Sequence, residues 1–156
     1  MTTSTHAARR PAAAPTSFAA VLLRGTYALF ALAGIVNGVR MLAAPAAWWA
    51  SIPGVEHTGA LNPHLVRDFG VAYAVAGAVL AWCALHPARA RLAHLAVTAF
   101  VGGHAAVHVA EIMAGQLPAE HWRIDFPTVI APALWLCILA LPPVWRAATG
   151  VPNARS

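Results

Sequence analysis

Residues 62–85 read NPHLVRDFGVAYAVAGAVLAWCAL, and this stretch decides the fold class of the chain. Asn62 supplies a capping side chain, and Pro63 follows at the first helical position, where its missing N–H costs nothing. The residues after Asp68 are almost all apolar, and the stretch has the length of about 20 residues that a membrane-spanning helix needs. Residues 63–85 are therefore predicted to cross a membrane.

Three further apolar runs have the same character, which predicts an all-α, integral membrane four-helix bundle. The expected spans are 18–42 (with Arg24 as an alternative start), 63–85, 91–114 and 127–145, within one domain over residues 18–146. Gly115 suits the end of the third span, and Asp125 with Pro127 the start of the fourth. Pro142-Pro143 is expected to end or kink the last helix. Residues 1–17 and 147–156, rich in Ala, Pro and Arg, are expected to be disordered.

Composition supports this class and excludes others. The 156 residues are 60% hydrophobic and 10% charged, with a mean hydropathy of +0.65, whereas soluble domains carry about 25% charged residues. The net charge of +5 comes from arginine alone, and the arginines stand at the ends of apolar runs instead of forming one basic stripe. We therefore expect a lipid bilayer as the environment and no nucleic acid as a partner. Cys83 and Cys137 form no CxxC motif and are interpreted as buried small hydrophobes.

The distribution of arginine predicts the orientation. Seven arginines fall on the side that holds both termini and three on the other: Arg9, Arg10, Arg24, Arg89, Arg91, Arg146 and Arg155 against Arg40, Arg67 and Arg123. The positive-inside rule then places both termini in the cytoplasm of a bacterial cell, with the connections 43–62 and 116–126 facing outward. The first span is longer than a signal-peptide core, so we expect it to be retained.

Small residues indicate how the helices meet. Gly34 and Gly38 form a GxxxG motif in the first span, and Gly70 lies among alanines in the second. Such residues let helix backbones approach closely in lipid. Packing within one chain is the main interpretation, and a homodimer through Gly34 and Gly38 is the alternative.

Polar residues gather at the outward ends of the spans. All five carboxylates and five of the eight histidines fall at or near that side. Residues four apart on a helix lie about 40° apart around its axis, so each of the patterns H-x3-H-x2-E and H-x3-D forms a narrow stripe. We expect one site there, with metal ligands His64, Asp68, His104, His108 and Glu111, and supporting polar residues Asn37, Arg40, Arg67, His121 and Asp125.

Three interpretations of this cluster stay open. Histidine and carboxylate pairs on facing helices suit zinc, iron, copper or manganese, which would make the chain a small metalloprotein, redox-active on an apolar substrate. The cluster is alternatively a structural network in which Arg40 or Arg67 pairs with Asp68 or Glu111, within a non-catalytic accessory subunit or small transporter. The third interpretation is a proton or solute relay through His and carboxylate steps. Trp48 and Trp49 lie in the first outer connection, as an interfacial belt or as a lid over an apolar ligand.

Two stretches of the chain also resemble a group of known proteins. Trp48-Trp49, Pro53-Gly54-Val55, Thr58-Gly59 and the stretch NPHLVRDFGVAYAVAGA of residues 62–78 resemble small bacterial four-helix membrane proteins of unassigned function, loosely DoxX-like. HAAVHVAEIMAG, residues 104–115, is similar to their third-helix motif, in which aspartate often replaces Glu111. The resemblance implies four helices and an outward His/Asp pole, and a link of some such proteins to quinone or thiol redox systems.

Overall fold

Four long apolar helices dominate the structure, a computed structural model that describes residues 17–150. They are α1 (Phe18–Ala43), α3 (Pro63–Leu85), α4 (Arg91–Met113) and a composite fourth helix over His121–Ala140. Each is long and apolar enough to cross a membrane, and at most 28% of any span's apolar window is buried inside the protein. The apolar side chains on the outer faces therefore suit contact with lipid, as expected for a multi-pass membrane protein.

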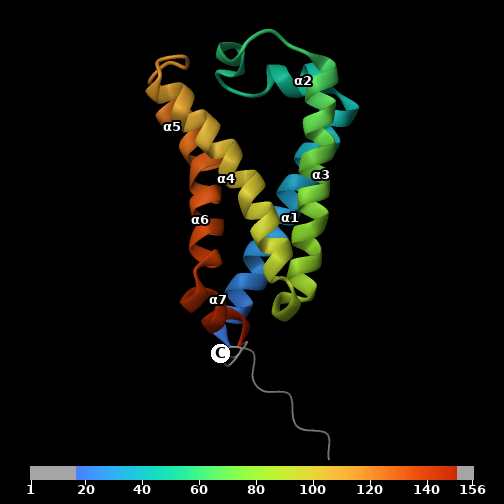
Figure 1. The fold of residues 1–156 in the computed structure, drawn as a ribbon. Coiled ribbons are helices and arrows are strands. Elements are labelled where there is room, and N and C mark those ends of the chain that lie inside the picture. Colours follow the sequence, from blue (N-terminus) through green and yellow to red (C-terminus); the bar gives the residue numbers. More distant parts are fainter. Residues whose placement is uncertain (1–16, 151–156) are drawn as a thin grey trace, which may run out of the picture.

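Short elements connect the spans at two ends, which we name for what they carry (Figure 1). The loop end holds α2 (Pro45–Ala50), η1 (Val55–Thr58) and α5 (His121–Asp125). The terminal end holds η2 (Pro87–Arg89) and α7 (Pro142–Thr149), and it is where the described chain begins and finishes. Both termini of the described chain thus lie at one end, as an even number of spans requires.

The helix starts follow the sequence signals closely. The Ser17 hydroxyl accepts a hydrogen bond from the Ala20 N–H at 3.2 Å. The Asn62 side chain accepts from the N–H groups of His64 and Leu65, each at 3.1 Å, with Pro63 at the first helical position. These caps satisfy backbone donors that have no partner inside the helix. The second and third spans begin and end within one residue of the predicted bounds.

The fourth span differs from the prediction of 127–145. It begins at His121 and passes through a π-helical turn, η3 (Phe126–Ile130), before α6 (Ala131–Ala140). The π turn accommodates Pro127, which has no N–H to donate. The helix then breaks at Leu141, whose extended ψ of 132° fits a residue that precedes proline. The helix α7 continues to Thr149 and Ala148 is buried, so the tail expected to be disordered from 147 is ordered up to 150; residues 1–16 and 151–156 lie outside the described part.

The α1 and α3 helices form the closest pair, and glycine makes the closeness possible. A Cβ added at Gly38 would lie 2.5 Å from the Gly70 carbonyl oxygen, and one at Gly77 would lie 2.8 Å from the Ile35 nitrogen. Gly34 faces Tyr73 and Gly77 in the same way. Packing within the chain therefore uses both glycines of the GxxxG motif. The homodimer through Gly34 and Gly38 stays an untested alternative.

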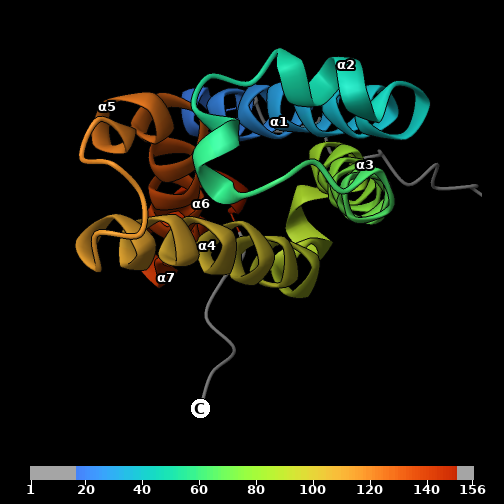
Figure 2. The same cartoon turned by 90° about the horizontal axis from the view of Figure 1, so that it is seen from above.

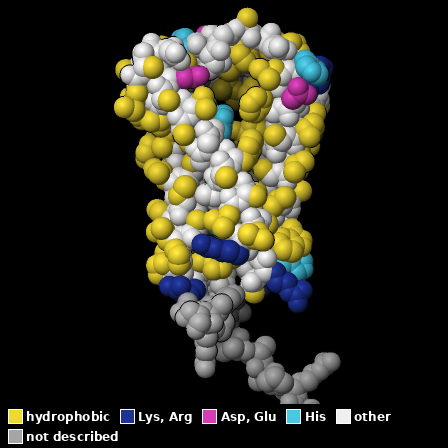
Figure 3. All heavy atoms as spheres, in the orientation of Figure 1, with side chains coloured by type: hydrophobic (Ala, Val, Ile, Leu, Met, Phe, Trp, Pro, Cys, Tyr) yellow, Lys and Arg dark blue, Asp and Glu magenta, His cyan; other side chains and the backbone are white. Residues whose placement is uncertain are grey.

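The main core lies towards the terminal end. Its buried members come from all four spans and from α7: Leu23, Tyr27, Ala31, Leu80, Cys83, Ala90, Val97, Leu136, Leu139, Trp145 and Ala148. Towards the loop end, the ribbons of the α1/α3 pair and the α4/α6 pair diverge (Figure 1), and in the view from above the connection that follows α2 crosses between the two pairs (Figure 2). The space-filling view shows that this end is hollowed, with hydrophobic side chains along the walls (Figure 3).

Candidate functional site

A buried carboxylate joins two histidines at the loop end. Asp125 Oδ2 accepts hydrogen bonds from His108 Nδ1 at 2.9 Å and from His121 Nδ1 at 3.0 Å. The Asp125 side chain is 8% exposed, that of His121 is 2% exposed and that of His108 is 18% exposed. Hydrogen bonds to an ionised acceptor are among the strongest in proteins, and here they fix both rings. This trio is the centre of the candidate site.

The local fold explains why these three residues meet. His121 and Asp125 lie four residues apart on α5, so they share one face of that helix. The turn between α4 and α5 folds back because the N–H groups of Gln116 and Leu117 both donate to the Glu111 carbonyl. Leu117 is buried in this turn. Its burial helps to hold α5 against the end of α4 that carries His108.

The network continues into the first outer connection. His57 Nδ1 lies 3.0 Å from His121 Nε2 and 3.9 Å from the Glu120 carboxylate. Gly54 permits this contact, because its φ of 70° favours glycine and a Cβ there would lie 3.0 Å from His121 Nε2. The connection that carries His57 therefore rests directly on the His121 ring.

The hydrogen bonds determine which nitrogen carries the proton in each neutral ring. An ionised Asp125 can only accept, so His108 and His121 both donate through Nδ1. His121 Nε2 is then an acceptor, and the donor to it is His57 Nδ1. Two basic nitrogens remain at the ends of the network, Nε2 of His108 and Nε2 of His57.

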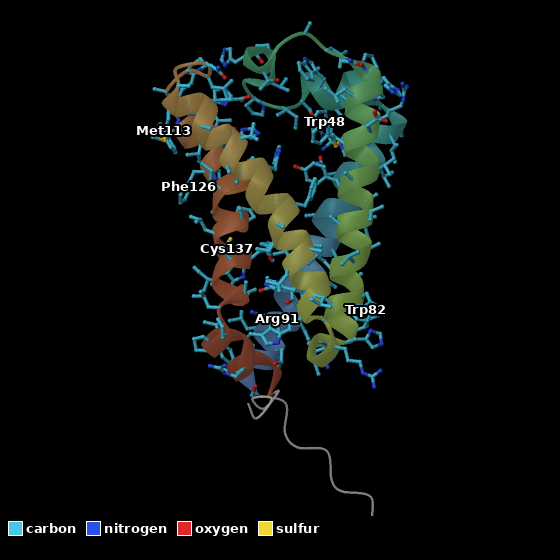
Figure 4. The ribbon with its side chains drawn as sticks, in the orientation of Figure 1. Trp48, Trp82, Arg91, Met113, Phe126 and Cys137 are labelled. Atoms are coloured by element: carbon cyan, nitrogen blue, oxygen red, sulfur yellow. The ribbon has the colours of Figure 1, made fainter. Side chains whose placement is uncertain are left out.

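Aromatic rings lie below His108 on the side of α3. The His104 ring stands 4.7 Å from that of His108, centroid to centroid, and 6.1 Å and 6.5 Å from those of Tyr73 and Phe69. These contacts span from α4 to α3. In Figure 4, many side chains of α4 and α3 project into the space between the helix pairs, whereas Met113, Phe126 and Cys137 point outward. The His108 ring therefore lies between the Asp125 carboxylate and the His104 ring, and it is partly exposed.

Several residues predicted for one site lie elsewhere. His64 and Asp68 pair with each other at 3.4 Å on the outside of α3, with their side chains 87% and 60% exposed. Glu111 is half-buried one turn beyond His108. Within residues 17–150, no three or more His, Cys, Asp or Glu side chains are grouped so that they could hold a metal ion. The five predicted ligands are thus not brought together, although His104 and His108 are neighbours.

Asn37, Arg40 and Trp48 hold α2 on α1 instead of lining the site. Trp48 Nε1 donates to Asn37 Oδ1 at 2.8 Å, and Arg40 donates to the Ser51 hydroxyl at 3.1 Å. Figure 4 shows Trp48 at the loop end on the α1/α3 side. Arg67 donates to the Leu42 carbonyl at 3.4 Å. Neither Arg40 nor Arg67 pairs with a carboxylate of the described residues, so the predicted arginine network is replaced by one built on histidine.

A second polar group is buried in the core of the terminal half. His94 is fully buried, and its Nδ1 lies 3.0 Å from the Tyr27 hydroxyl and its Nε2 3.4 Å from that of Thr98. Arg91 stacks over the Trp145 ring at 5.1 Å. Both nitrogens of His94 have a partner and neither reaches solvent, as is usual for a buried polar group with a structural role.

The sequence interpretation underrated three members of the site. Asp125 and His121 were expected only as supporting residues, and His57 was not singled out. The signal for the first two was present, because HWRID has the same H-x3-D spacing as HLVRD. His57 lies in a connection without helical periodicity, so no spacing rule reaches it.

Comparison with known proteins adds no assignment. No family model, curated protein or solved structure matches this chain. The four apolar helices implied by the resemblance are present, while the DoxX-like family itself is without support.

Proposed function

We propose that this multi-pass membrane protein binds an apolar small molecule with a protic head group at its loop end, and that His108 accepts the head-group proton. The observation that carries the proposal is the buried Asp125 carboxylate, which holds His108 and His121 through the same oxygen. A carboxylate that accepts from Nδ1 leaves Nε2 of the ring as the base and stabilises the imidazolium that forms.

The proton moves from the ligand to His108 without any further reactant. The bond between the head-group oxygen and its hydrogen breaks, and the proton bonds to His108 Nε2. The resulting imidazolium stays paired with the Asp125 carboxylate at 2.9 Å, so the buried negative charge of Asp125 becomes compensated. His121 and His57 keep the carboxylate oriented. The ligand, now an anion, either leaves the site or takes the proton back from His108. Both outcomes are compatible with catalysis and with proton-coupled transport.

The apolar body of the ligand is inferred from the surroundings of His108. The loop end is hollowed, with hydrophobic side chains along the walls (Figure 3), and the neighbouring His104 ring packs against Phe69 and Tyr73 of α3. Ligand sites combine mostly apolar walls with a few polar groups that fix orientation. A molecule dissolved in the bilayer could place its body between the helix pairs and its head group against His108.

The test uses two pairs of probes that share an octyl chain and differ in whether the head-group oxygen carries a hydrogen or a methyl group: 4-octylphenol and its methyl ether, and nonanoic acid and its methyl ester. The purified protein is titrated calorimetrically in mild detergent. In at least one pair, the protic probe should bind about tenfold more tightly than its methylated partner. His108→Gln should abolish this preference. His64→Gln is the matched control, because it removes an exposed histidine from the same end. Equal binding within both pairs, or an equal loss in the control, would contradict the proposal.

Metal-assisted redox chemistry is the second candidate. What supports it is the Asp125–His108 hydrogen bond, since histidine ligands of metals usually donate their other N–H to a carboxylate, together with His104 beside His108. Two neighbouring histidines fall short of a closed metal site, so a bound zinc, iron, copper or manganese ion would need further ligands. Metal content measured by mass spectrometry on tag-free protein, beside the variant His104→Ala/His108→Ala, decides this candidate. Stoichiometric metal that is lost in the folded variant supports it, and metal at background level in both opposes it.

We also propose that the terminal end faces the cytoplasm of a bacterial cell and the loop end faces outward. Support comes from the arginine bias, with seven arginines on the terminal side against three. In a background with both native cysteines replaced by serine, Thr58→Cys should react with a membrane-impermeant maleimide in intact cells. Thr149→Cys should react only after lysis. The reverse pattern would invert the assigned orientation.

A further inference from the structure

We propose that Arg24 and Arg89 form a binding site for the phosphate group of an anionic membrane lipid at the terminal end. The proposal starts from a pocket of about 280 Å³ between the beginning of α1, the end of α3, η2 and α7. Its polar lining consists of Arg24, His86, Arg89 and Thr149, and Leu85 and Ala148 contribute apolar surface. The pocket thus combines two guanidinium groups with apolar walls.

The hydrogen-bonding capacity of this pocket suits an anion. The Thr149 hydroxyl donates to the Trp145 carbonyl at 2.8 Å, and His86 Nδ1 lies 3.2 Å from the Trp82 carbonyl, to which it donates. The two arginines have no such internal partner among residues 17–150. Each guanidinium carries five N–H donors and matches phosphate oxygens in a two-pronged geometry.

The charge distribution along the whole chain leaves these arginines uncompensated. All five carboxylate side chains belong to the loop half: Glu56, Asp68, Glu111, Glu120 and Asp125. Figure 3 shows the same separation on one face, with the acidic side chains near the loop end and most of the arginine near the terminal end. No Asp or Glu side chain of the terminal half therefore supplies a counter-charge for Arg24 and Arg89. Anionic lipid head groups supply it where basic side chains meet a membrane surface.

The position of the pocket favours a lipid over a soluble phosphate ester. Leu85, in the pocket wall, is 69% exposed, and Trp82 one turn earlier on α3 is 42% exposed. The His86 ring stacks on Trp82 at 5.2 Å, and Figure 4 shows Trp82 on the outer side of α3 near the terminal end. Exposed tryptophan and leucine beside arginine mark the level of the head groups. The acyl chains would lie along the apolar span while the phosphate meets the guanidinium groups.

The experiment compares three probes on the full-length protein in neutral detergent: dioctanoyl phosphatidylglycerol, dioctanoyl phosphatidylcholine and glycerol 3-phosphate. Dissociation constants come from calorimetry. We expect phosphatidylglycerol to bind about tenfold more tightly than either other probe. The variant Arg24→Gln/Arg89→Gln should lose about tenfold of that affinity, whereas Arg67→Gln/Arg123→Gln, which removes the same charge from the loop end, should keep it.

Three outcomes would overturn the proposal. Equal affinities for the two lipids would show that the negative charge is not recognised. An equal loss in both double variants would show that net charge, and not the pocket, governs binding. If glycerol 3-phosphate binds as tightly as phosphatidylglycerol and competes with it, the occupant is a soluble phosphate ester and not a lipid.

Discussion

The two ends of the bundle use histidine in opposite ways. At the terminal half, His94 lies fully buried in the main core, and two hydroxyl groups satisfy its nitrogens. At the loop end, the helix pairs diverge and His108 keeps 18% of its side chain exposed, with one nitrogen fixed by Asp125. A buried histidine with both nitrogens satisfied is the usual arrangement of a structural residue. One with a fixed Nδ1 and no protein partner at Nε2 among the described residues has a nitrogen left to meet a ligand, and this difference is why we propose the protic ligand site at the loop end.

The largest effect should come from the helix contact on which both ends depend. Gly38→Leu forces a side chain into the space where a Cβ alone would meet the Gly70 carbonyl at 2.5 Å. We expect a loss of about 3 kcal/mol or more in the free energy of unfolding, because neither backbone can move aside. Gly102→Leu is the matched control, with nothing within 4 Å of its added Cβ. Reversible denaturation in mixed micelles measures both, and similar stabilities would show that α1 and α3 are not in close contact.

The second prediction separates the two histidines. His94→Ala should lower the free energy of unfolding by about 2 kcal/mol or more, because it leaves a cavity and removes the partner of the buried Tyr27 hydroxyl. The preference for protic probes should stay unchanged. His108→Ala should abolish the preference at a smaller cost in stability, since its ring is partly exposed. Loss of the probe preference in His94→Ala at full folding would break the distinction between the two ends.

A smaller effect is expected at the connection that covers the loop end. Trp48→Phe removes the hydrogen bond to Asn37, worth about 1 kcal/mol. Because this bond ties α2 to α1, amide hydrogen exchange should rise in residues 45–58 while α4 and α6 stay protected. Trp49→Phe, which changes the adjacent half-buried indole, should leave exchange close to that of the parent. Faster exchange throughout the spans of Trp48→Phe would show that the connection supports the whole bundle.

The smallest effect concerns the rim of the network. Glu120 lies 3.9 Å from His57, and its side chain is 52% exposed. Solvent screens such a pair, so Glu120→Gln should change the free energy of unfolding by no more than about 0.5 kcal/mol. Probe binding should also stay within about twofold of the parent. A tenfold weaker affinity in this variant would place the functional centre at His57 instead of His108.

The sequence alone predicted the spans well because apolar length and capping signals are local. Asn62-Pro63 and the positions of the third span were confirmed to within a residue. The fourth span was misplaced because prolines were interpreted as helix limits, whereas a π turn carries Pro127 through the helix. Whether a helix can contain a proline depends on the geometry of the neighbouring turn, and sequence rules for helix ends do not include that geometry.

The site was predicted at the correct end but with the wrong centre. Two H-x3-D pairs have equal spacing, and only the rotation of each helix decides which pair faces inward. His64 and Asp68 lie about 150° around α3 from Gly70 and Gly77, the face that α1 covers. They therefore point away from the close helix contact and remain exposed. His121 and Asp125 are turned inward by the fold of residues 113–120, which no periodicity encodes.

Our proposal depends on Asp125, which fixes the His108 and His121 rings through Nδ1 and leaves His108 Nε2 as a base. Nitrogen-15 NMR of histidine-labelled protein near neutral pH tests it directly, with His108→Gln and His121→Gln used to assign the signals. We predict that both rings carry hydrogen on Nδ1 with a bare Nε2 in His108, and that Asp125→Asn removes this preference. Hydrogen on Nε2 and a bare Nδ1 in either ring would contradict the account.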